Sequence, residues 1–360
     1  SLDADSEGEE GKFYVWTKAE LDSVLGADAE WVAAYYGVTE RGNWEHGNSV
    51  LMVQTSPAEF AEKQGWPEQE LLDKLEVVKE KLFTARAVRI RPGLDDKILT
   101  SWNALMLKGY VDAYLAFGEE RFLKAATRNA LFIEKNLRNG HRLNRNYKDG
   151  KASINAFLDD YALLADAYLA LYRATLEPAW LERGKGLVDY AIEHFYSEEK
   201  KMFFYTSDED PALIARKMEL TDNVIPASNS VMANVLFDMS LLFDEKKYRD
   251  MSTQMLHNIK NDMPKYGSGY SNWGILMLKH LQPYYEVVIA GAEAHAKARE
   301  FDQHYLPNIL LVAAKEEKDG QLPLLDYRFV GGVTRIYVCQ NMACKLPVDE
   351  VTAALDQMKK

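Results

Sequence analysis

The residues best suited to chemistry begin with a pair of carboxylates at Asp95-Asp96, followed by Lys97 and then by Trp102-Asn103. One aspartate at a helix start is adequately explained as an N-cap. A cap does not need two acids, a lysine and then a tryptophan and an asparagine one and a half turns later. An indole face beside carboxylates suits a sugar ring, because the ring stacks on its apolar C–H face while the acids accept its hydroxyls. The segment therefore favours a sugar site.

A second pair of acids, Asp159-Asp160, stands with Tyr161 inside an otherwise apolar stretch. Adjacent helical residues point about 100° apart, so at most one of the two carboxylates should face a given direction. A buried acid is costly unless it is paired or hydrated. Two interpretations stay open: a structural hydrogen bond to a neighbouring helix, or a carboxylate that faces a cavity.

The third polar cluster is Asp222 followed by Ser228, Asn229 and Ser230, at the predicted start of another helix. Capping by Ser228 is one interpretation. The alternative is a site for sugar hydroxyls or an anion at the helix N-terminus. If these three clusters converge, Asp96, Asp160 and Asp222 are the candidate catalytic carboxylates.

The elements that must position these acids are predominantly helices in a weak internal repeat of about 60 residues. Each copy ends one helix, turns, and begins the next with an acid followed by an aromatic residue: Glu119 with Phe122, Glu177 with Trp180, and Glu245 with Tyr248. Hairpins of two long helices fit this length. We predict a mainly α fold, an incomplete (α/α)6-type toroid. Its inner helices start with acidic residues, and these starts should lie together at one mouth of the toroid.

The predicted toroid covers residues 1–282, and a small α/β subdomain covers residues 283–360, where short β-branched runs alternate with helices. Capping boxes at Thr17-Glu20 and Ser56-Glu59 predict two helix starts in the N-terminal part. An apolar stripe at three- and four-residue steps predicts the buried face of the helix after Asp96. Its members are Leu99, Trp102, Met106, Tyr110, Ala113 and Phe117.

Composition excludes several classes of function. The 360 residues carry 43 Lys and Arg against 55 Asp and Glu, a net charge of −12, which disfavours nucleic-acid binding. No apolar run approaches the length of a membrane span, so we expect no membrane partner. Two cysteines in 360 residues form no disulfide framework, so we expect a reducing, cytoplasmic location. Cys339 and Cys344 have neither redox nor metal spacing, so we expect reduced thiols. The scattered histidines predict no metal site, and no cofactor-binding motif is present.

Several segments together resemble the YyaL/spermatogenesis-associated thioredoxin-fused family: the run from Asp3 to Trp16, Asp95 to Asn103, Phe157 to Ala162, Pro226 to Ser230, and Tyr337 to Cys344 with Pro347. The resemblance runs from end to end. It implies a helical toroid similar to six-hairpin glycosidases and N-acylglucosamine 2-epimerases, preceded by a thioredoxin-like domain as partner. That domain and the family's first helical stretch are absent from this chain. We therefore expect exposed apolar edges and self-association.

The leading hypothesis is glycoside hydrolysis of a sugar or glycan substrate, with one protonated carboxyl as acid and one carboxylate activating water. Asp96, Asp160 and Asp222 would be catalytic. Asp95, Lys97, Trp102, Asn103, Asp159, Tyr161, Ser228 and Asn229 would bind the substrate. One alternative is a non-catalytic glycan- or protein-binding module that serves the thioredoxin-like domain, with Cys339 and Cys344 as redox partners. A sugar epimerase is less favoured, because these motifs contain no histidine.

Overall fold

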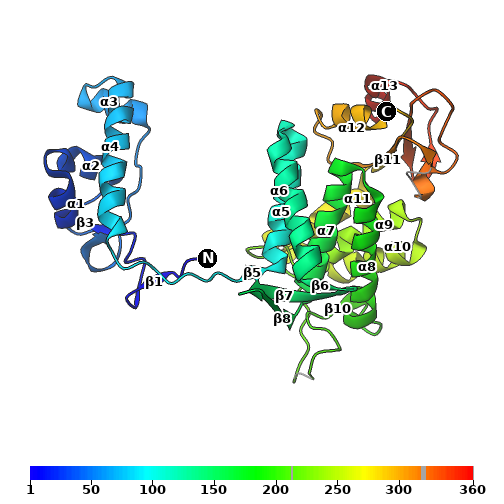
Figure 1. The fold of residues 1–360 in the computed structure, drawn as a ribbon, viewed down its shortest axis with the longest axis horizontal. Helices are drawn as coiled ribbons and strands as arrows, with labels where there is room; N and C mark the ends of the chain where they lie inside the picture. Colours follow the sequence, from blue (N-terminus) through cyan, green and yellow to red (C-terminus); the bar gives the residue numbers. More distant parts are fainter. Residues whose placement is uncertain (212–213, 318–321, 360) are drawn as a thin grey trace. The chain divides into compact units, whose positions relative to one another are not determined.

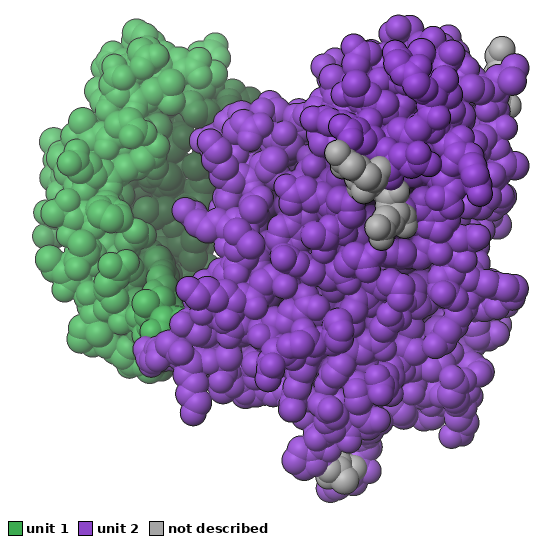
Figure 2. Space-filling view, turned by 45° about the vertical axis from the view of Figure 1, so that its right-hand side comes forward, with its two compact units in different colours: residues 1–96 green, residues 97–360 purple. Residues whose placement is uncertain are grey.

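The computed structural model describes residues 1–211, 214–317 and 322–359, and it divides into two compact units, residues 1–96 and 97–360 (Figures 1 and 2). Residues 1–96, which the sequence analysis assigned to the toroid, have an apolar core of their own around Leu21, Val32 and Leu71. The subdomain boundary expected at residue 283 lies inside the second unit and stays a prediction. Within the described residues, no helix combines the length and the apolar character needed to cross a membrane.

Unit 1 is built from four helices and four two-residue strands. Thr17 and Ser56 form the predicted capping boxes at the starts of α1 and α3, with Glu20 and Glu59 as their reciprocal partners. The helices are α1 (Lys18–Leu25), α2 (Ala29–Tyr36), α3 (Pro57–Gln64) and α4 (Glu68–Ala87), and the strands are β1 (Asp5–Ser6), β2 (Glu9–Glu10), β3 (Trp16–Thr17) and β4 (Asn48–Ser49).

Unit 2 contains the predicted antiparallel helical hairpins. The inner helices are α5 (Thr100–Phe117), α7 (Leu158–Thr175), α9 (Ser228–Leu242) and α11 (Ser271–Leu281). The outer helices are α6 (Glu120–Asn136), α8 (Pro178–Phe195) and α10 (Lys246–Ile259). Each inner helix packs against the next, and α5, α7 and α9 each pack against the outer helix that follows in sequence (Figure 1). The chain is therefore an incomplete (α/α) toroid, as predicted.

The turns of the three hairpins are equivalent. Each contains one residue in the left-handed region, with φ of 72° at Gly118, 59° at Leu176 and 50° at Asp244. The next residue is in each case a glutamate that forms the N-cap of the outer helix. A leucine rarely adopts positive φ, and Leu176 is buried here in the apolar cluster of the C-terminal sheet. The repeat seen in the sequence is thus a repeat of backbone conformation.

Small strands accompany the helices. Strands β5 (Ile98–Leu99), β6 (Arg138–Asn139), β7 (Arg142–Lys148) and β8 (Lys151–Asn155) form an antiparallel sheet in which β5 leads into α5 and β8 leads towards α7. Strands β9 (Tyr196–Ser197) and β10 (Met202–Phe203) pair after α8. The first sheet therefore lies at the N-terminal ends of α5 and α7 (Figure 1).

The C-terminal residues form the α/β region predicted from the change of period. Strand β11 (Tyr285–Ala290) pairs in parallel with β12 (Ile309–Ala314) and antiparallel with β13 (Arg335–Gln340), which pairs with β14 (Ala343–Cys344). Helices α12 (Ala294–Phe301) and α13 (Val351–Met358) pack on one face of this sheet. Side chains on the other face join the core of the helical hairpins. The sheet is thereby fixed against the toroid.

The buried face of α5 differs from the prediction. Trp102, Met106 and Phe117 are 51%, 55% and 72% exposed, and the residues that pack inwards are Ala104, Leu107, Val111 and Tyr114. Both stripes have helical spacing, so periodicity alone could not choose between them. Helix α5 is an end member of the arc of inner helices, and an end helix has a neighbouring inner helix on one side only. Its second apolar stripe stays uncovered.

A second correction concerns the cysteines. Cys339 and Cys344 were expected as reduced thiols, but they form a disulfide. They are direct partners in the antiparallel pairing of β13 with β14. The short hairpin brings the two side chains together, which their spacing along the sequence did not reveal.

Candidate functional site

Asp160 lies in the first turn of α7 and is fully buried. Its Oδ1 accepts a hydrogen bond from the backbone N–H of Ser101 at 2.8 Å, and its Oδ2 accepts from the backbone N–H of Phe157 and from Arg145 Nη1, both at 3.0 Å. One carboxylate therefore caps its own helix and the start of α5. Burial and the adjacent Asp159 raise the pKa of Asp160 to about 7. The contacts favour the structural hydrogen-bond interpretation, and the catalytic role stays a prediction.

Asp159 shares the same cation. Arg145 Nη1 donates to Asp159 Oδ1 at 3.0 Å, and the guanidinium lies 4.7 Å from the centre of the Phe157 ring. Both adjacent acids thus reach Arg145, although the sequence analysis expected at most one of them to face a given direction. The long side chain of Arg145 from β7 allows this, because it bridges the angle between them.

Asp222 is also a capping residue. Its Oδ1 accepts from the backbone N–H of Ala227 at 2.9 Å and from Ser230 Oγ at 2.8 Å, and its Oδ2 accepts from the backbone N–H of Asn272 at 2.8 Å. The carboxylate therefore joins the N-termini of α9 and α11. Asp160 and Asp222 perform equivalent tasks, since each links the starts of two neighbouring inner helices.

The predicted substrate-binding residues near these acids are mostly internal. Tyr161 is fully buried, and its hydroxyl accepts from the backbone N–H of Leu143 at 2.9 Å. Asn229 is fully buried and bonds both backbone groups of Phe203, at 2.9 and 3.0 Å. Ser228 is buried, with its backbone N–H bonded to Glu219 at 2.9 Å. These contacts stabilise the hairpins, and a role in binding substrate stays a prediction.

The first cluster is the more accessible one. Asp95, Asp96, Lys97 and Trp102 are exposed, and Asn103 bonds the backbone oxygen of Leu99 at 2.8 Å. Asp96 is the last residue of unit 1, whereas Asp160 and Asp222 belong to unit 2. The expected convergence of these three carboxylates therefore stays a prediction.

A cavity of about 710 Å³ lies at the other half of the inner helices. It is open to solvent and is lined by the C-terminal halves of α5, α7 and α9 and by the segment from Phe301 to Leu311. Its polar lining includes Lys108, Asp112, Asp166, Arg173, Asp238, Tyr284, Asp302 and His304. Carboxylates from three successive inner helices thus converge, but on a different set of aspartates from the predicted one.

The charges in this cavity are linked to one another. Lys108 Nζ lies 3.4 Å from Asp166 Oδ2, and this pairing, aided by Asp112, raises the pKa of Lys108. Loss of surrounding water raises the pKa of Asp112, and the negative charge of Asp166 adds to that effect, while Lys108 opposes it. The Asp112 side chain is nevertheless exposed at the cavity. It can therefore meet a ligand while it holds a proton more readily than an ordinary aspartate.

The third carboxylate is fixed by its neighbours. Asp238 accepts from Lys279 Nζ at 2.8 Å and from the Tyr284 hydroxyl at 3.1 Å. On the opposite wall Asp302 pairs with Arg173 and with Arg299, the latter at 2.9 Å. The cavity thus combines the exposed carboxyl of Asp112 with ion-paired carboxylates around it.

In the part of the chain that the structure describes, no group of three or more His, Cys, Asp or Glu could hold a metal ion.

The sequence contained a signal for these residues in the repeat itself. Counted back from the N-cap glutamates at 119, 177 and 245, Asp112 and Asp238 both stand seven residues earlier. Lys108 and Asp166 both stand eleven residues earlier. The difference of four residues is about one helical turn, so the two sets form neighbouring layers on one face. His304 also lines the cavity and was missed, because it lies in a loop outside every motif.

No family model matches the chain. The resemblance seen in the motifs is confirmed by relatives named spermatogenesis-associated protein 20. The human protein is 28% identical over 97% of this chain and 50% of its own length, and the mouse protein is equally similar over the same shares. The chain thus spans about half the length of these curated relatives.

Solved structures resemble parts of the chain. An α-mannanase of glycoside hydrolase family 76 from Bacteroides thetaiotaomicron is 15% identical, with a TM-score of 0.39 over 48% of each chain. A family 105 glycoside hydrolase from C. acetobutylicum is 12% identical, with a TM-score of 0.39 over 57% of this chain and 61% of its own. A sugar epimerase from a ruminal bacterium is 16% identical, with a TM-score of 0.38 over 48% of this chain and 47% of its own.

Proposed function

We propose that this chain binds a sugar or short glycan in the cavity of α5, α7 and α9 and acts on it by carboxylate acid/base chemistry. The observation that carries the proposal is the meeting of Asp112, Asp166 and Lys108 in one open cavity. Two carboxyl groups in unlike surroundings are the usual basis of acid and base roles. Asp112, whose pKa is raised, would supply the proton, and Asp166, ion-paired with Lys108, would act as the base.

The size and lining of the cavity suit such a ligand. Its volume of about 710 Å³ falls in the range of roughly 300–1,000 Å³ that is usual for small-molecule sites. Carboxylates and a lysine can accept from and donate to several hydroxyls at once. Tyr172 and Tyr284 add apolar ring surface on which the C–H face of a sugar can lie.

The test is a panel of oligosaccharides assayed for turnover and for binding by calorimetry. Asp112→Asn should lower kcat by about 10²-fold or more, the usual contribution of a general acid, with binding changed by only a few fold. Asp166→Asn should lower both turnover and binding. Asp250→Asn on the outer helix α10, which removes the same charge from an exposed ion pair, should change neither. Equal turnover in all four proteins would refute the assignment.

The predicted acids at the N-terminal ends are tested in the same assay. If Asp96, Asp160 or Asp222 performs the chemistry, the corresponding asparagine variant should lose turnover and stay folded. Loss of stability with turnover per folded molecule unchanged would leave Asp160 and Asp222 as capping residues.

The second candidate is a binding module without catalytic activity. It is favoured by the contacts of Asp160 and Asp222, whose carboxylate oxygens already accept hydrogen bonds from backbone amides. It predicts measurable glycan affinity and no turnover of any bound sugar. In that case Asp112→Asn and Asp166→Asn would both weaken binding.

A further inference from the structure

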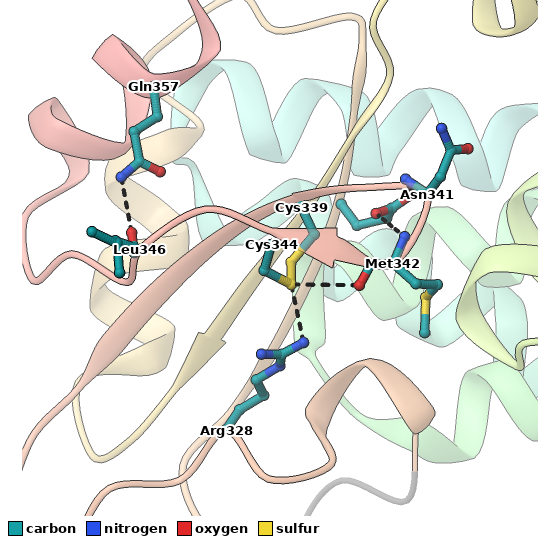
Figure 3. The surroundings of a disulfide bond; sticks show 8 residues. Arg328, Cys339, Asn341, Met342, Cys344, Leu346 and Gln357 are labelled. Atoms are coloured by element: carbon teal, nitrogen blue, oxygen red, sulfur yellow. Dashed lines mark hydrogen bonds between the residues drawn. A yellow bond between two sulfur atoms is a disulfide. The ribbon is translucent and has the colours of Figure 1, made fainter.

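The disulfide between Cys339 and Cys344 has two unlike sulfur environments (Figure 3). Cys339 lies on β13 and is 1% exposed, whereas Cys344 on β14 is partly exposed. Arg328 Nη2 lies 3.0 Å from Cys344 Sγ. The guanidinium is 4.8 Å from the centre of the Tyr337 ring, and the Tyr337 hydroxyl donates to the backbone oxygen of Arg328 at 3.0 Å. A cation that is held in place therefore contacts the sulfur of the partly exposed cysteine, Cys344.

The hairpin that carries the two cysteines is held by contacts other than the disulfide. Its turn residues Asn341 and Met342 both have positive φ, 51° and 64°, which asparagine adopts readily and methionine only rarely. Their backbone N–H groups donate to the two carboxylate oxygens of the buried Glu286, at 3.1 and 3.2 Å. Since Glu286 fixes the turn, the two sulfurs should stay close together after the bond between them is broken.

From these contacts we propose that Cys339–Cys344 is a redox-active disulfide that exchanges with a dithiol reductant, and that Cys344 is the sulfur attacked. One thiolate of the reductant attacks Cys344 Sγ, the bond to Cys339 breaks, and Cys339 leaves as a thiolate that takes a proton from water. The second thiolate of the reductant then attacks the reductant's first sulfur, which is bonded to Cys344 Sγ in the mixed disulfide. Cys344 leaves as a thiolate beside Arg328, and the reductant becomes an intramolecular disulfide. Two electrons have passed to the protein.

The geometry favours a dithiol over a monothiol. After the first step Cys339 remains next to the mixed disulfide, because the hairpin is held by Glu286. An adjacent thiol acts at a very high effective concentration, so it reverses attack by a monothiol. A reductant with a second thiol of its own can resolve the mixed disulfide before that reversal. Arg328 assists twice, since a guanidinium attracts the incoming thiolate and stabilises the departing one.

The first experiment uses the full chain in its oxidised form with two reductants, reduced thioredoxin as the protein dithiol and glutathione as the monothiol. The readout is mass spectrometry after alkylation. We expect thioredoxin to reduce Cys339–Cys344 at least tenfold faster than glutathione at equal thiol concentration. Equal rates would overturn the preference for a dithiol. Resistance to both reductants in the folded protein would overturn the proposal as a whole.

The second experiment follows alkylation of the reduced chain by iodoacetamide from pH 6 to pH 10. Cys344 should react first, and Arg328→Gln should slow its reaction about tenfold at pH 7 but little at pH 10, where the thiol is ionised without help. Arg335→Gln on β13, which breaks the pair with Asp349, is the matched control and should leave the rate at pH 7 and the rate at pH 10 unchanged. The role assigned to Arg328 and Cys344 is wrong if Cys339 of the unsubstituted protein reacts first. It is also wrong if Arg328→Gln slows alkylation equally at pH 7 and at pH 10.

Discussion

Replacing Asp160 separates a capping role from a catalytic one. In Asp160→Ala the buried N–H groups of Ser101 and Phe157 lose their acceptor, and Arg145 loses one of its two carboxylates. An unsatisfied buried donor costs about 1–3 kcal/mol. A buried charge left without any partner costs about 3–5 kcal/mol, which is an upper bound here because Arg145 keeps its pair with Asp159. The two costs are not additive, because the same Asp160 carboxylate makes the backbone hydrogen bonds and the ion pair. We therefore expect unfolding free energy to fall by about 3–5 kcal/mol in total.

Asp160→Asn should cost less, about 2–3 kcal/mol, because the amide oxygen can still accept from one backbone N–H while its NH₂ group faces the remaining donors. For a unit of this size each kcal/mol corresponds to roughly 2–4 °C in Tm. The expected shift is then about 4–12 °C for Asp160→Asn. Asp166→Asn on the same helix is the matched control, since its carboxylate faces the open cavity, and its Tm should change by less than about 3 °C.

The assay is calorimetry combined with hydrogen exchange. Exchange localises the effect, because loss of the cap should deprotect amides at the start of α5 near Ser101 as well as those at the start of α7. The capping argument is refuted if both Asp160 variants keep the wild-type Tm within about 1 °C and show unchanged exchange near Ser101. Loss of sugar turnover in such a stable variant would then support the catalytic role predicted from the sequence.

Three further predictions test other parts of the chain. Burial and the cations Arg249 and Lys279 lower the pKa of His280 in the folded protein. Below about pH 6.5 the unfolded chain therefore binds more protons than the folded chain, and the free energy of unfolding should fall as the pH drops. Urea denaturation should show this fall, and the fall should be less steep in His280→Gln. Asn229→Ala should lose about 2–4 kcal/mol in the same assay because its buried side chain makes three hydrogen bonds, whereas Asn139→Ala at an exposed position should lose almost nothing. The chain should self-associate in sedimentation velocity through the exposed apolar edge of α11, and Leu278→Lys should reduce this; a stable monomer would contradict the prediction.

Local sequence signals were sufficient for most of the fold. The capping boxes at Thr17 and Ser56 begin helices where predicted, because a hydroxyl and a glutamate at fixed spacing satisfy their own backbone amides. The three turns were recognised because each has a glutamate at the N-cap position and an aromatic residue three positions later. Such features depend on a few neighbouring residues, so a single sequence can reveal them.

The features that were missed depend on partners far away in the chain. Trp102 and Met106 were expected to be buried because their spacing is helical, yet which face of α5 is covered depends on α7, more than 40 residues later. Cys339 and Cys344 were expected to be reduced because their spacing matches no motif, yet the register of β13 with β14 makes them direct partners. In both cases the spacing was read correctly, and the tertiary neighbour decided the outcome.

The two groups of aspartates differ in what their carboxylate oxygens contact, and this difference carries the functional argument. Asp160 and Asp222 accept from main-chain N–H groups at helix starts, so their oxygens are committed before any ligand arrives. Asp166 pairs with a side chain, and Asp112 stays exposed at the cavity, so a ligand can rearrange or displace their contacts without breaking a helix cap. A catalytic carboxyl must change its partners during a reaction cycle. The two layers that contain Lys108, Asp112, Asp166 and Asp238 meet that requirement better than the helix starts do.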